Sequence, residues 1–268
     1  MRYSIWDPTG NITALVENDI EKTEQPSVAA ALMERHPQVE QVGFVRFNKD
    51  DLQVCLQMAG GEFCGNAAMS AAALYLLRTD HSSEAPQNVR IGVSGALTPL
   101  EAILVEIDAK TYSASLQTPW STSVDHIQFS FQERGGTLPV VDLGGIIQVI
   151  IQPDSVFWDM LNHRSEAERA IAQCCSELSA PGLGFMFLDQ RDDLFEMTPL
   201  VYVPGAGTVF WENSCASGST AVCMYFASET GTDVKLVLRQ PGGLMRVRCD
   251  GPGEDIILQG STRLVQFG

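Results

Sequence analysis

Two cysteines stand in matching sequence contexts about half a chain length apart. Cys64 lies within Glu62–Tyr75 and Cys215 within Glu212–Tyr225. In each segment an acidic residue precedes the cysteine and small or polar residues follow it. A run of small apolar residues comes next and ends near a tyrosine. Such a run predicts a buried helix that begins at the cysteine. Its recurrence indicates an internal duplication.

A thiol at the start of a helix faces unpaired backbone N–H groups and the positive end of the helix dipole. For both cysteines this predicts a pKa lowered from about 8.5 towards the range of roughly 3.5–7.5. The same N–H groups form a site for an anion such as the α-carboxylate of an amino acid. We expect this site to comprise Gly65 and Asn66 beside one cysteine and Ala216 and Ser217 beside the other.

Two thiols on opposite sides of one carbon atom suit a racemase. If both helix starts face one cleft, a carboxylate bound there places its α-carbon between Cys64 and Cys215. One sulfur then removes the α-proton while the other returns a proton to the opposite face. Two thiolates in one dry cleft repel each other, so one thiolate and one thiol are expected at rest. The sequence therefore predicts an amino-acid racemase that stabilises its intermediate with N–H groups instead of a cofactor.

The other five cysteines have no comparable context. Free cysteines are usually small buried hydrophobes, and this is what we expect of Cys55, Cys174, Cys175, Cys223 and Cys249. An odd count, with no CxxC pair and no cluster of Cys and His, predicts neither a disulfide framework nor a metal site. Spacing alone leaves a Cys–His hydrolase open, although none of the four histidines lies beside a glycine-rich motif.

The formal net charge of −16 bears on the class of partner. A field of this sign repels nucleic acid and anionic membranes, and no basic stretch with interleaved aromatics offsets it. No apolar run has the length of a membrane span, and the first residues lack the basic start and apolar run of a signal peptide. We therefore expect a cytoplasmic protein with a small-molecule substrate, and neither nucleic acid nor membrane as a partner.

Many short strands and few helices must position the two cysteines. This pattern predicts an α+β fold with mixed or antiparallel sheets. Besides the two cysteine helices, we expect helices at Ser27–Arg35 and Ser165–Leu178, and one long strand at Val140–Gln152. The other strands are expected at Arg2–Trp6, Ile12–Glu17, Gln41–Phe47, Leu52–Met58, Val89–Val93, Ala102–Ile107, Tyr112–Gln117, His126–Gln132, Gly184–Asp189, Leu200–Val203, Asp233–Arg239, Met245–Cys249 and Ile256–Leu258.

Two domains of similar design are expected, each a sheet wrapped round the helix that begins at its cysteine. Thr118–Trp120 is expected as the linker, so that the first domain spans residues 1–118 and the second 119–256. The last strand, at about 257–268, is expected to return to the first domain.

These motifs resemble those of the diaminopimelate epimerase family, and the similarity covers most of the chain. The matching segments are Thr9–Asn11, Gln41, Gly61–Asn66, Cys215–Gly218, Gln240–Gly243 and Leu258–Gly268. The resemblance implies two pseudo-symmetric α+β domains, a homodimer, and catalysis by Cys64 and Cys215 without cofactor or metal. It also implies that Asn11 and Gln41 bind the substrate.

The chain departs from that family where the far end of diaminopimelate is recognised. Where the family has Asn-Pro-His, this chain has Gly145–Ile147, and where the family has a Glu-Arg pair, it has Val203–Pro204. Two asparagines of the family are replaced by Met58 and Gly182. Loss of a bidentate arginine weakens the binding of a distal carboxylate strongly. The departures therefore disfavour diaminopimelate as the substrate.

A closer resemblance is to the histidine racemases of staphylopine-type metallophore synthesis. It rests on Thr9–Val16, Glu40–Phe44, Glu62–Ala67, Pro199–Leu200, Trp211–Cys215 and Gln240–Gly243. It implies interconversion of L- and D-histidine for an opine-type metallophore, with Glu40 and Glu212 contacting the α-ammonium or the imidazole. The alternative for each glutamate is a solvated or capping carboxylate, and Trp211 belongs either to the pocket or to the core.

Three alternatives remain open at this point. A racemase of the same fold can act on another neutral or polar amino acid. A dehydratase or simple isomerase of a related fold is a second alternative, but such an enzyme normally replaces one cysteine, and this chain retains Cys64 and Cys215. A metallophore- or amino-acid-binding protein is the third, and it has no turnover to lose when a cysteine is replaced.

Overall fold

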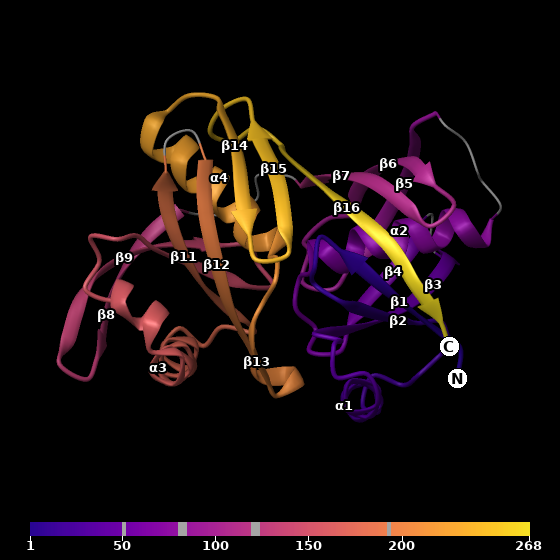
Figure 1. The fold of residues 1–268 in the computed structure, drawn as a ribbon, viewed down its shortest axis with the longest axis horizontal. Coiled ribbons are helices and arrows are strands. Elements are labelled where there is room, and N and C mark those ends of the chain that lie inside the picture. Colours follow the sequence, from indigo (N-terminus) through magenta and orange to yellow (C-terminus); the bar gives the residue numbers. More distant parts are fainter. Residues whose placement is uncertain (50–51, 80–84, 119–123, 192–193) are drawn as a thin grey trace.

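The computed structural model describes residues 1–49, 52–79, 85–118, 124–191 and 194–268, which form an α+β fold. Two lobes lie side by side (Figure 1). The first lobe carries both chain termini, and the second is formed by the middle of the chain. All described strands belong to one hydrogen-bonded sheet that runs through both lobes.

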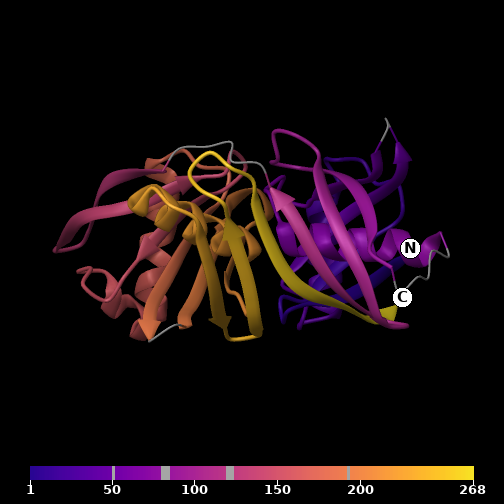
Figure 2. The same ribbon diagram turned by 90° about the horizontal axis from the view of Figure 1, so that it is seen from above.

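The first lobe is a ring of strands around helix α2 (Gly65–Arg78) (Figure 2). In order round the ring, the strands are β1 (Tyr3–Pro8), β2 (Thr13–Val16), β3 (Gln41–Lys49), β4 (Leu52–Met58), β5 (Gln87–Val93), β6 (Leu100–Asp108), β7 (Thr111–Thr118) and β16 (Ile256–Phe267). The ring closes because β16 pairs with both β7 and β1. Helix α1 (Gln25–Arg35) joins the parallel strands β2 and β3.

The second lobe packs a sheet against helix α4 (Ala216–Thr230). Its strands are β8 (Val124–Phe131), β9 (Arg134–Asp142), β10 (Ile147–Ile151), β11 (Leu183–Arg191), β12 (Leu194–Val203), β13 (Thr208–Trp211), β14 (Val234–Gln240) and β15 (Gly243–Cys249). Helix α3 (Arg164–Glu177) joins the parallel strands β10 and β11, and β15 pairs with β16 to link the lobes. Short 3₁₀ helices lie at Trp158–Asn162 and Pro204–Ala206.

Helices α2 and α4 are the central helices of their lobes, and each begins directly after a cysteine, as predicted. Every residue from Gly65 to Leu76 is buried, because a run of Gly, Ala, Ser and Met is narrow enough to fit inside the ring. The first nine residues of α4, Ala216–Met224, are buried in the same way. Packing on all sides fixes the position of both helix N-termini.

The single strand predicted at Val140–Gln152 is wrong. Two antiparallel strands, β9 and β10, lie there, with a turn between them. Gly144 adopts a φ of +80° in this turn, and its N–H donates to the Asp142 carboxylate at 2.7 Å. Apolar residues on both sides of the turn concealed it, although Gly144 and Gly145 stand there and glycine is the residue that a left-handed φ favours.

Other boundaries differ less. The helices predicted at Ser27–Arg35 and Ser165–Leu178 are shifted by one or two residues at their ends. Strand β12 is longer than expected, because it continues along β11, and β13 was not expected. Strand β16 runs from Ile256 to Phe267, over both stretches expected as strand near the C-terminus.

The expected domain limits remain a prediction, since Pro119 and Trp120 of the expected linker lie outside the described residues. Within the described part of the chain, no helix has both the length and the apolarity to cross a bilayer.

Candidate functional site

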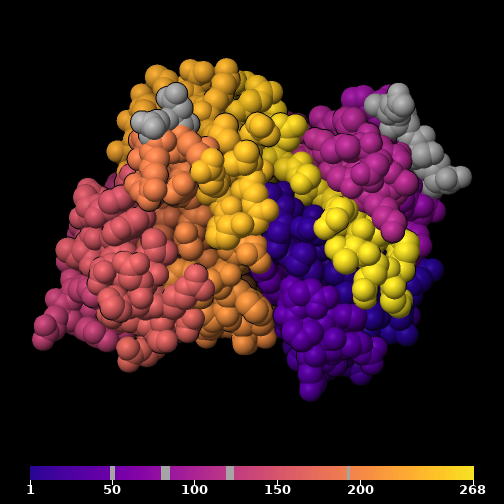
Figure 3. Space-filling model, viewed as in Figure 1, coloured from indigo at the N-terminus to yellow at the C-terminus, as the bar shows by residue number. Residues whose placement is uncertain are grey.

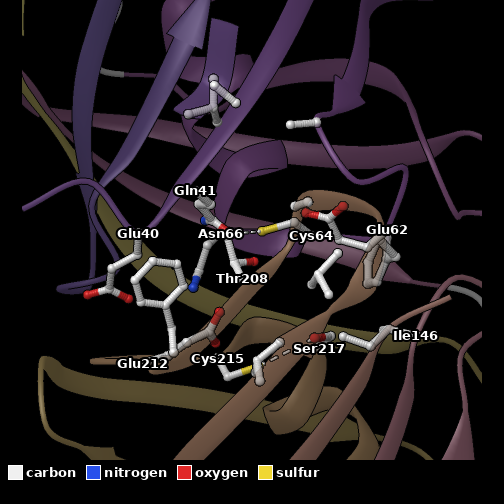
Figure 4. A pocket seen from close by; sticks show the side chains of 18 of the residues that line it. Glu40, Gln41, Glu62, Cys64, Asn66, Ile146, Thr208, Glu212, Cys215 and Ser217 are labelled. Atoms are coloured by element: carbon white, nitrogen blue, oxygen red, sulfur yellow. Dashed lines mark hydrogen bonds between the residues drawn. The ribbon is translucent and has the colours of Figure 1, made fainter. Parts of the chain in front are cut away.

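A cleft lies where the two lobes meet, and Cys64 and Cys215 both line it. Figure 3 shows the surface along which the lobes join, and Figure 4 shows the cleft from close by. The cleft holds about 700 Å³ of space free of protein atoms, its open mouth included. The described lining residues contain three glutamates and no Lys, Arg or His.

Cys64 is the N-cap of α2 and lies at the first-lobe side of the cleft. Its backbone is extended (φ −136°, ψ 108°), and the residue is 9% exposed. The sulfur accepts a hydrogen bond from the Ala67 N–H (3.4 Å), and the thiol donates to Gln41 Oε1 (3.0 Å). The cap geometry therefore fixes the thiol between the helix start and the first residue of β3.

Cys215 is the N-cap of α4 and takes the same place at the second-lobe side (Figure 4). It is 3% exposed, with φ −129° and ψ 109°. Its sulfur accepts from the Gly218 N–H (3.3 Å) and lies 3.4 Å from Ser217 Oγ. Its own N–H donates to Gln240 Oε1 (2.7 Å), which ties the helix start to β14.

The N-termini of α2 and α4 touch. A Cβ placed on Gly65 would lie 2.8 Å from the Cβ of Ala216. The first backbone N–H that donates to a carbonyl of its own helix turn is that of Ala68 in α2 and that of Ser219 in α4. The N–H groups of the residues before them have no such partner. Two sets of backbone donors and two positive dipole ends thus converge at one point of the cleft.

Both thiols have a raised pKa, so the predicted lowering is wrong. Burial raises the pKa of Cys64 to about 12. The hydrogen bond from the Ala67 N–H lowers this pKa, whereas the charges of Glu212 and Glu62 raise it further. Burial also raises the pKa of Cys215 well above its usual range, with the charge of Glu212 as the second cause. One N–H donor does not outweigh the loss of water around a thiolate. With these pKa values both thiols carry their protons, whereas one thiol and one thiolate were expected. A thiolate becomes more favourable when a positive charge neutralises the nearby carboxylates.

Three carboxyl groups share the cleft. Burial raises the pKa of Glu40 to about 7, although the Asn213 side chain donates to it at 2.6 Å. Burial and the charge of Glu40 raise the pKa of Glu212 to about 8. Burial also raises the pKa of Glu62. A site with this charge pattern is suited to a ligand that brings positive charge into it.

Replacement of Glu212 by glutamine should stabilise the protein at pH 8 and leave its stability at about pH 4 nearly unchanged. A carboxyl whose pKa is higher in the folded than in the unfolded state contributes stability below its unfolded value, near 4.5, and loses it as the pH rises through about 8. With a discount for partial exposure, we expect a gain of about 2 kcal/mol in the free energy of unfolding at pH 8. Urea unfolding at the two pH values measures it, and an equal gain at both would contradict the assignment.

Nine of the ten residues predicted for the site line the cleft. They are Glu40, Gln41, Cys64, Gly65, Asn66, Glu212, Cys215, Ala216 and Ser217. Asn11 is the tenth and lies behind the lining. Its Nδ2 donates to the Ser214 carbonyl oxygen (2.9 Å), which also accepts from Asn66 Nδ2 (3.0 Å), and it hydrogen-bonds Glu212.

The sequence analysis did not assign Glu62 or the apolar wall to the site. Glu62 is 8% exposed and stands two residues before Cys64, so its place in the cysteine motif was the available signal. The apolar wall comes from turns and strand ends distant in sequence, and its members include Ile146, Val201, Val203, Ala206 and Phe210. Trp211 belongs to the core, where it stacks on Phe187 with ring centroids 5.7 Å apart.

The described residues contain no group of three or more His, Cys, Asp or Glu side chains placed to hold a metal ion. The described lining residues present thiols, carboxyls, amides, hydroxyls and backbone N–H groups. This set can bind a carboxylate and a cation and can move protons.

Comparison with known proteins gives consistent results over the whole chain. A family model described as the histidine racemase CntK N-terminal domain matches residues 1–268. A histidine racemase of Fusobacterium nucleatum subsp. nucleatum is 30% identical over 273 residues, which cover 98% of this chain and 94% of that protein. A histidine racemase of Staphylococcus aureus is 28% identical over 275 residues, which cover 100% and 96%.

Solved structures with the same fold have low sequence identity to the chain. A probable proline racemase from Agrobacterium radiobacter K84, with bound carbonate, superposes with a TM-score of 0.72 at 11% identity and covers 100% of this chain and 92% of its own. A hydroxyproline epimerase from Agrobacterium vitis, with bound trans-4-hydroxy-L-proline, gives 0.68 at 12% identity, with coverage of 100% and 90%.

Proposed function

The chain belongs to the histidine racemase family, and from this premise we propose that it interconverts L- and D-histidine with Cys64 and Cys215 as acid and base. It is thus an isomerase of the amino-acid racemase class. The observation that supports the two-thiol mechanism best is the pair of N-cap cysteines on opposite sides of one cleft. The resemblance to diaminopimelate epimerases remains a prediction.

The substrate's α-carboxylate occupies the point where the two helix N-termini converge. The N–H groups of Gly65 and Asn66 reach it from one lobe, and those of Ala216 and Ser217 from the other. As the α-proton leaves, the carboxylate gains enolate character, and each preorganised donor is worth about 3 kcal/mol of barrier. The α-carbon then lies between the two sulfurs, so that a proton removed on one face is replaced on the other.

Histidine brings a positive charge, which the described lining residues of the cleft lack. Its α-ammonium and its imidazole are two groups for which Glu40 and Glu212 are the proposed contacts, with Glu62 as a third carboxyl nearby. Within the described residues, Oε2 of Glu40, Oε2 of Glu62 and Oδ1 of Asn66 are buried and have no hydrogen-bond partner. Buried acceptors of this kind are costly unless they are paired, so a cationic substrate relieves them.

The far wall of the cleft supports histidine over diaminopimelate. Ile146 and Val203 stand there in segments where diaminopimelate epimerases carry polar or charged residues, and Phe210 adds an aromatic face. An apolar wall suits the flat imidazole ring and offers nothing to a second carboxylate.

The two lobes are proposed to be related by duplication. In the first lobe, α1 joins the parallel pair β2 and β3, and α2 joins the parallel pair β4 and β5. In the second lobe, α3 joins the parallel pair β10 and β11, and α4 lies between the parallel strands β12 and β14. On this correspondence β9 matches β1 and β14 matches β5. The domain limits near residues 118 and 256 follow the same proposal.

Contacts between glycines at the lobe interface fit the same two-fold relation. Gly10, after β1, meets Gly242, after β14, and a Cβ on Gly10 would lie 2.5 Å from the Gly242 Cα. Gly145, after β9, meets Gly95, after β5, and a Cβ on Gly145 would lie 2.4 Å from the Gly95 Cα. A two-fold axis exchanges these two pairs. Such backbone contacts hold the two lobes close together.

Exchange of the α-hydrogen in D₂O tests the proposed function. The protein is incubated with each enantiomer of a panel of amino acids, diaminopimelate included, under reducing conditions and without added cofactor. Deuterium at the α-carbon is measured by mass spectrometry, and loss of optical rotation is followed in parallel. We expect exchange and racemisation with both enantiomers of histidine, and neither with diaminopimelate.

The panel separates the alternatives. Exchange with another amino acid instead of histidine would overturn the substrate, and no exchange with any amino acid would overturn the racemase. A protein in which both Cys64 and Cys215 are replaced by serine is the matched control. Supply of D-histidine to an opine-type metallophore, independence of cofactors, a homodimer and a cytoplasmic location remain predictions.

A further inference from the structure

The three carboxyl groups of the cleft lie towards its two ends (Figure 4). Glu40 and Glu212 lie together at one end, where the charge of Glu40 raises the pKa of Glu212. Glu62 lies at the other end, on the side of Ile146, and the two thiols lie between the ends. An α-carbon held between the two sulfurs can thus direct its ammonium group to one end and its side chain to the other.

The end at Glu62 has a wall that suits an aromatic ring. A Cβ placed on Gly60 would lie 2.5 Å from Val203 Cγ1 and 3.2 Å from the Ala206 Cβ, both of the second lobe. The same Cβ would lie 2.7 Å from Glu62 Oε2. Because Gly60 has no side chain, the Glu62 carboxyl of one lobe can lie next to apolar atoms of the other. An apolar wall with one placed polar group is typical of a site that binds a small ring.

At the other end, both carboxyls have polar neighbours. Glu40 accepts a hydrogen bond from Asn213 Nδ2 at 2.6 Å. Glu212 hydrogen-bonds the Asn11 side chain and the Cys215 thiol. An ammonium group has three donors and no acceptor, so two neighbouring carboxyls suit it better than they suit a ring.

The Glu62 carboxyl is held in place and lacks a partner. The Ser94 hydroxyl donates to the Glu62 carbonyl oxygen (2.9 Å) and accepts from the Met58 N–H (2.9 Å), which fixes the turn that carries Glu62. Glu62 is 8% exposed, and among the described residues its Oε2 has no hydrogen-bond partner. A buried acceptor without a partner is costly, so a donor that the ligand brings to this carboxyl stabilises the complex.

We propose that Glu62 is the residue that selects histidine, by accepting a hydrogen bond from the N–H of the substrate's imidazole at the apolar end of the cleft. An imidazole has an N–H donor in its neutral and in its protonated form, and the protonated ring adds a positive charge. The inference rests on the proposed histidine racemase function and narrows it, because Glu40 and Glu212 are then left with the α-ammonium. The distal carboxylate of diaminopimelate would meet Glu62 as a like charge, which disfavours that substrate.

The binding of two ligands of similar shape tests this assignment. L-Histidine has a ring N–H, whereas L-β-(2-thienyl)alanine has an aromatic ring of similar size without one. Calorimetric titration uses the Cys64→Ser/Cys215→Ser protein, in which no turnover changes the ligand, with and without Glu62→Gln. Glutamine keeps the size of the side chain and removes its charge. We expect Glu62→Gln to weaken histidine binding about tenfold, the effect of losing a hydrogen bond to a charged group.

Thienylalanine should respond in the opposite direction. Its ring covers the Glu62 carboxyl without offering a donor, and covering an unpaired charge is unfavourable. We therefore expect Glu62→Gln to strengthen thienylalanine binding severalfold. A general defect of the cleft cannot produce this gain, so the same measurement shows that the variant is folded.

Glu40→Gln in the same background is the matched control. It removes a carboxyl from the end proposed for the ammonium, and both ligands carry the same α-ammonium. We expect it to weaken histidine and thienylalanine by the same factor, so that the preference between them stays as in the parent.

Unchanged histidine binding in Glu62→Gln, or equal weakening of the two ligands, would overturn the role of Glu62. A preference for histidine that is lost in Glu40→Gln instead would place the imidazole at the other end. These titrations require no turnover. If the parent protein exchanges histidine in D₂O while Glu62→Gln leaves binding unchanged, only the assignment of Glu62 fails. If the ligands separate as expected and no amino acid exchanges, the racemase fails and the binding role of Glu62 stands.

Discussion

Replacement of Cys64 or Cys215 by serine should lower kcat for racemisation by about a thousandfold or more. A serine hydroxyl is a much weaker acid than a thiol and ionises too rarely to remove an α-proton. Positioned acid–base groups are typically worth about 10²- to 10⁴-fold. Each inversion uses both sulfurs, one on either face of the α-carbon. Either substitution alone should therefore abolish turnover in both directions, as measured by polarimetry with L- and D-histidine.

Cys223→Ala is the matched control for this experiment. Cys223 lies on α4, on the same helix that Cys215 caps, and is fully buried away from the cleft. Its replacement removes a thiol from the helix and should leave kcat within a few-fold of the parent. If a single serine variant at position 64 or 215 retained normal racemisation, the two-thiol mechanism would be wrong.

Replacement of Gly65 by alanine should reduce kcat by about a hundredfold without unfolding the protein. Gly65 is the first residue of α2 and has an ordinary helical backbone, so alanine is not strained there. Its Cβ would lie 2.8 Å from the Cβ of Ala216, so the two helix N-termini must move apart. A displacement of about 1 Å in a catalytic constellation can cost about 10² in rate.

The compensating exchange provides a direct control. In the double variant Gly65→Ala/Ala216→Gly the methyl group moves from one helix to the other, and the space between the N-termini is restored. We expect the double variant to recover most of the parent kcat, and thermal unfolding to show that the single variant is folded. A single variant with parent activity, or a double variant as slow as the single, would show that the spacing of these helices does not limit the reaction.

The local sequence predicted the helix starts because their causes are local. A narrow apolar run after Cys64 can form a buried helix, and a cysteine before it can cap that helix through its own sulfur. The same reasoning holds at Cys215. It failed at Val140–Gln152, where a turn interrupts an apolar run, because apolar periodicity alone does not report the φ of +80° at Gly144.

The pKa of the thiols could not be predicted from local sequence. The helix start at Cys64 provides one N–H donor, and this effect was predicted correctly in sign. Desolvation acts in the opposite direction and is the largest effect, and the charges of Glu212 and Glu62 add to it. Glu212 is distant from Cys64 in the chain, so its charge enters only when the lobes meet.

The sequence by itself determined that this protein has two capped, buried helices, each with a thiol at its N-terminus, and it identified nine residues that line the cleft. These features follow from residue types within a few positions of each cysteine. The tertiary structure decided the rest: the contact of Gly65 with Ala216, the three carboxyls gathered without a cation among the described lining residues, and the hydrogen bonds of Gln41 and Ser217 with the two sulfurs. Each of these depends on distances between segments far apart in the chain, and only the packing of the two lobes fixes such distances.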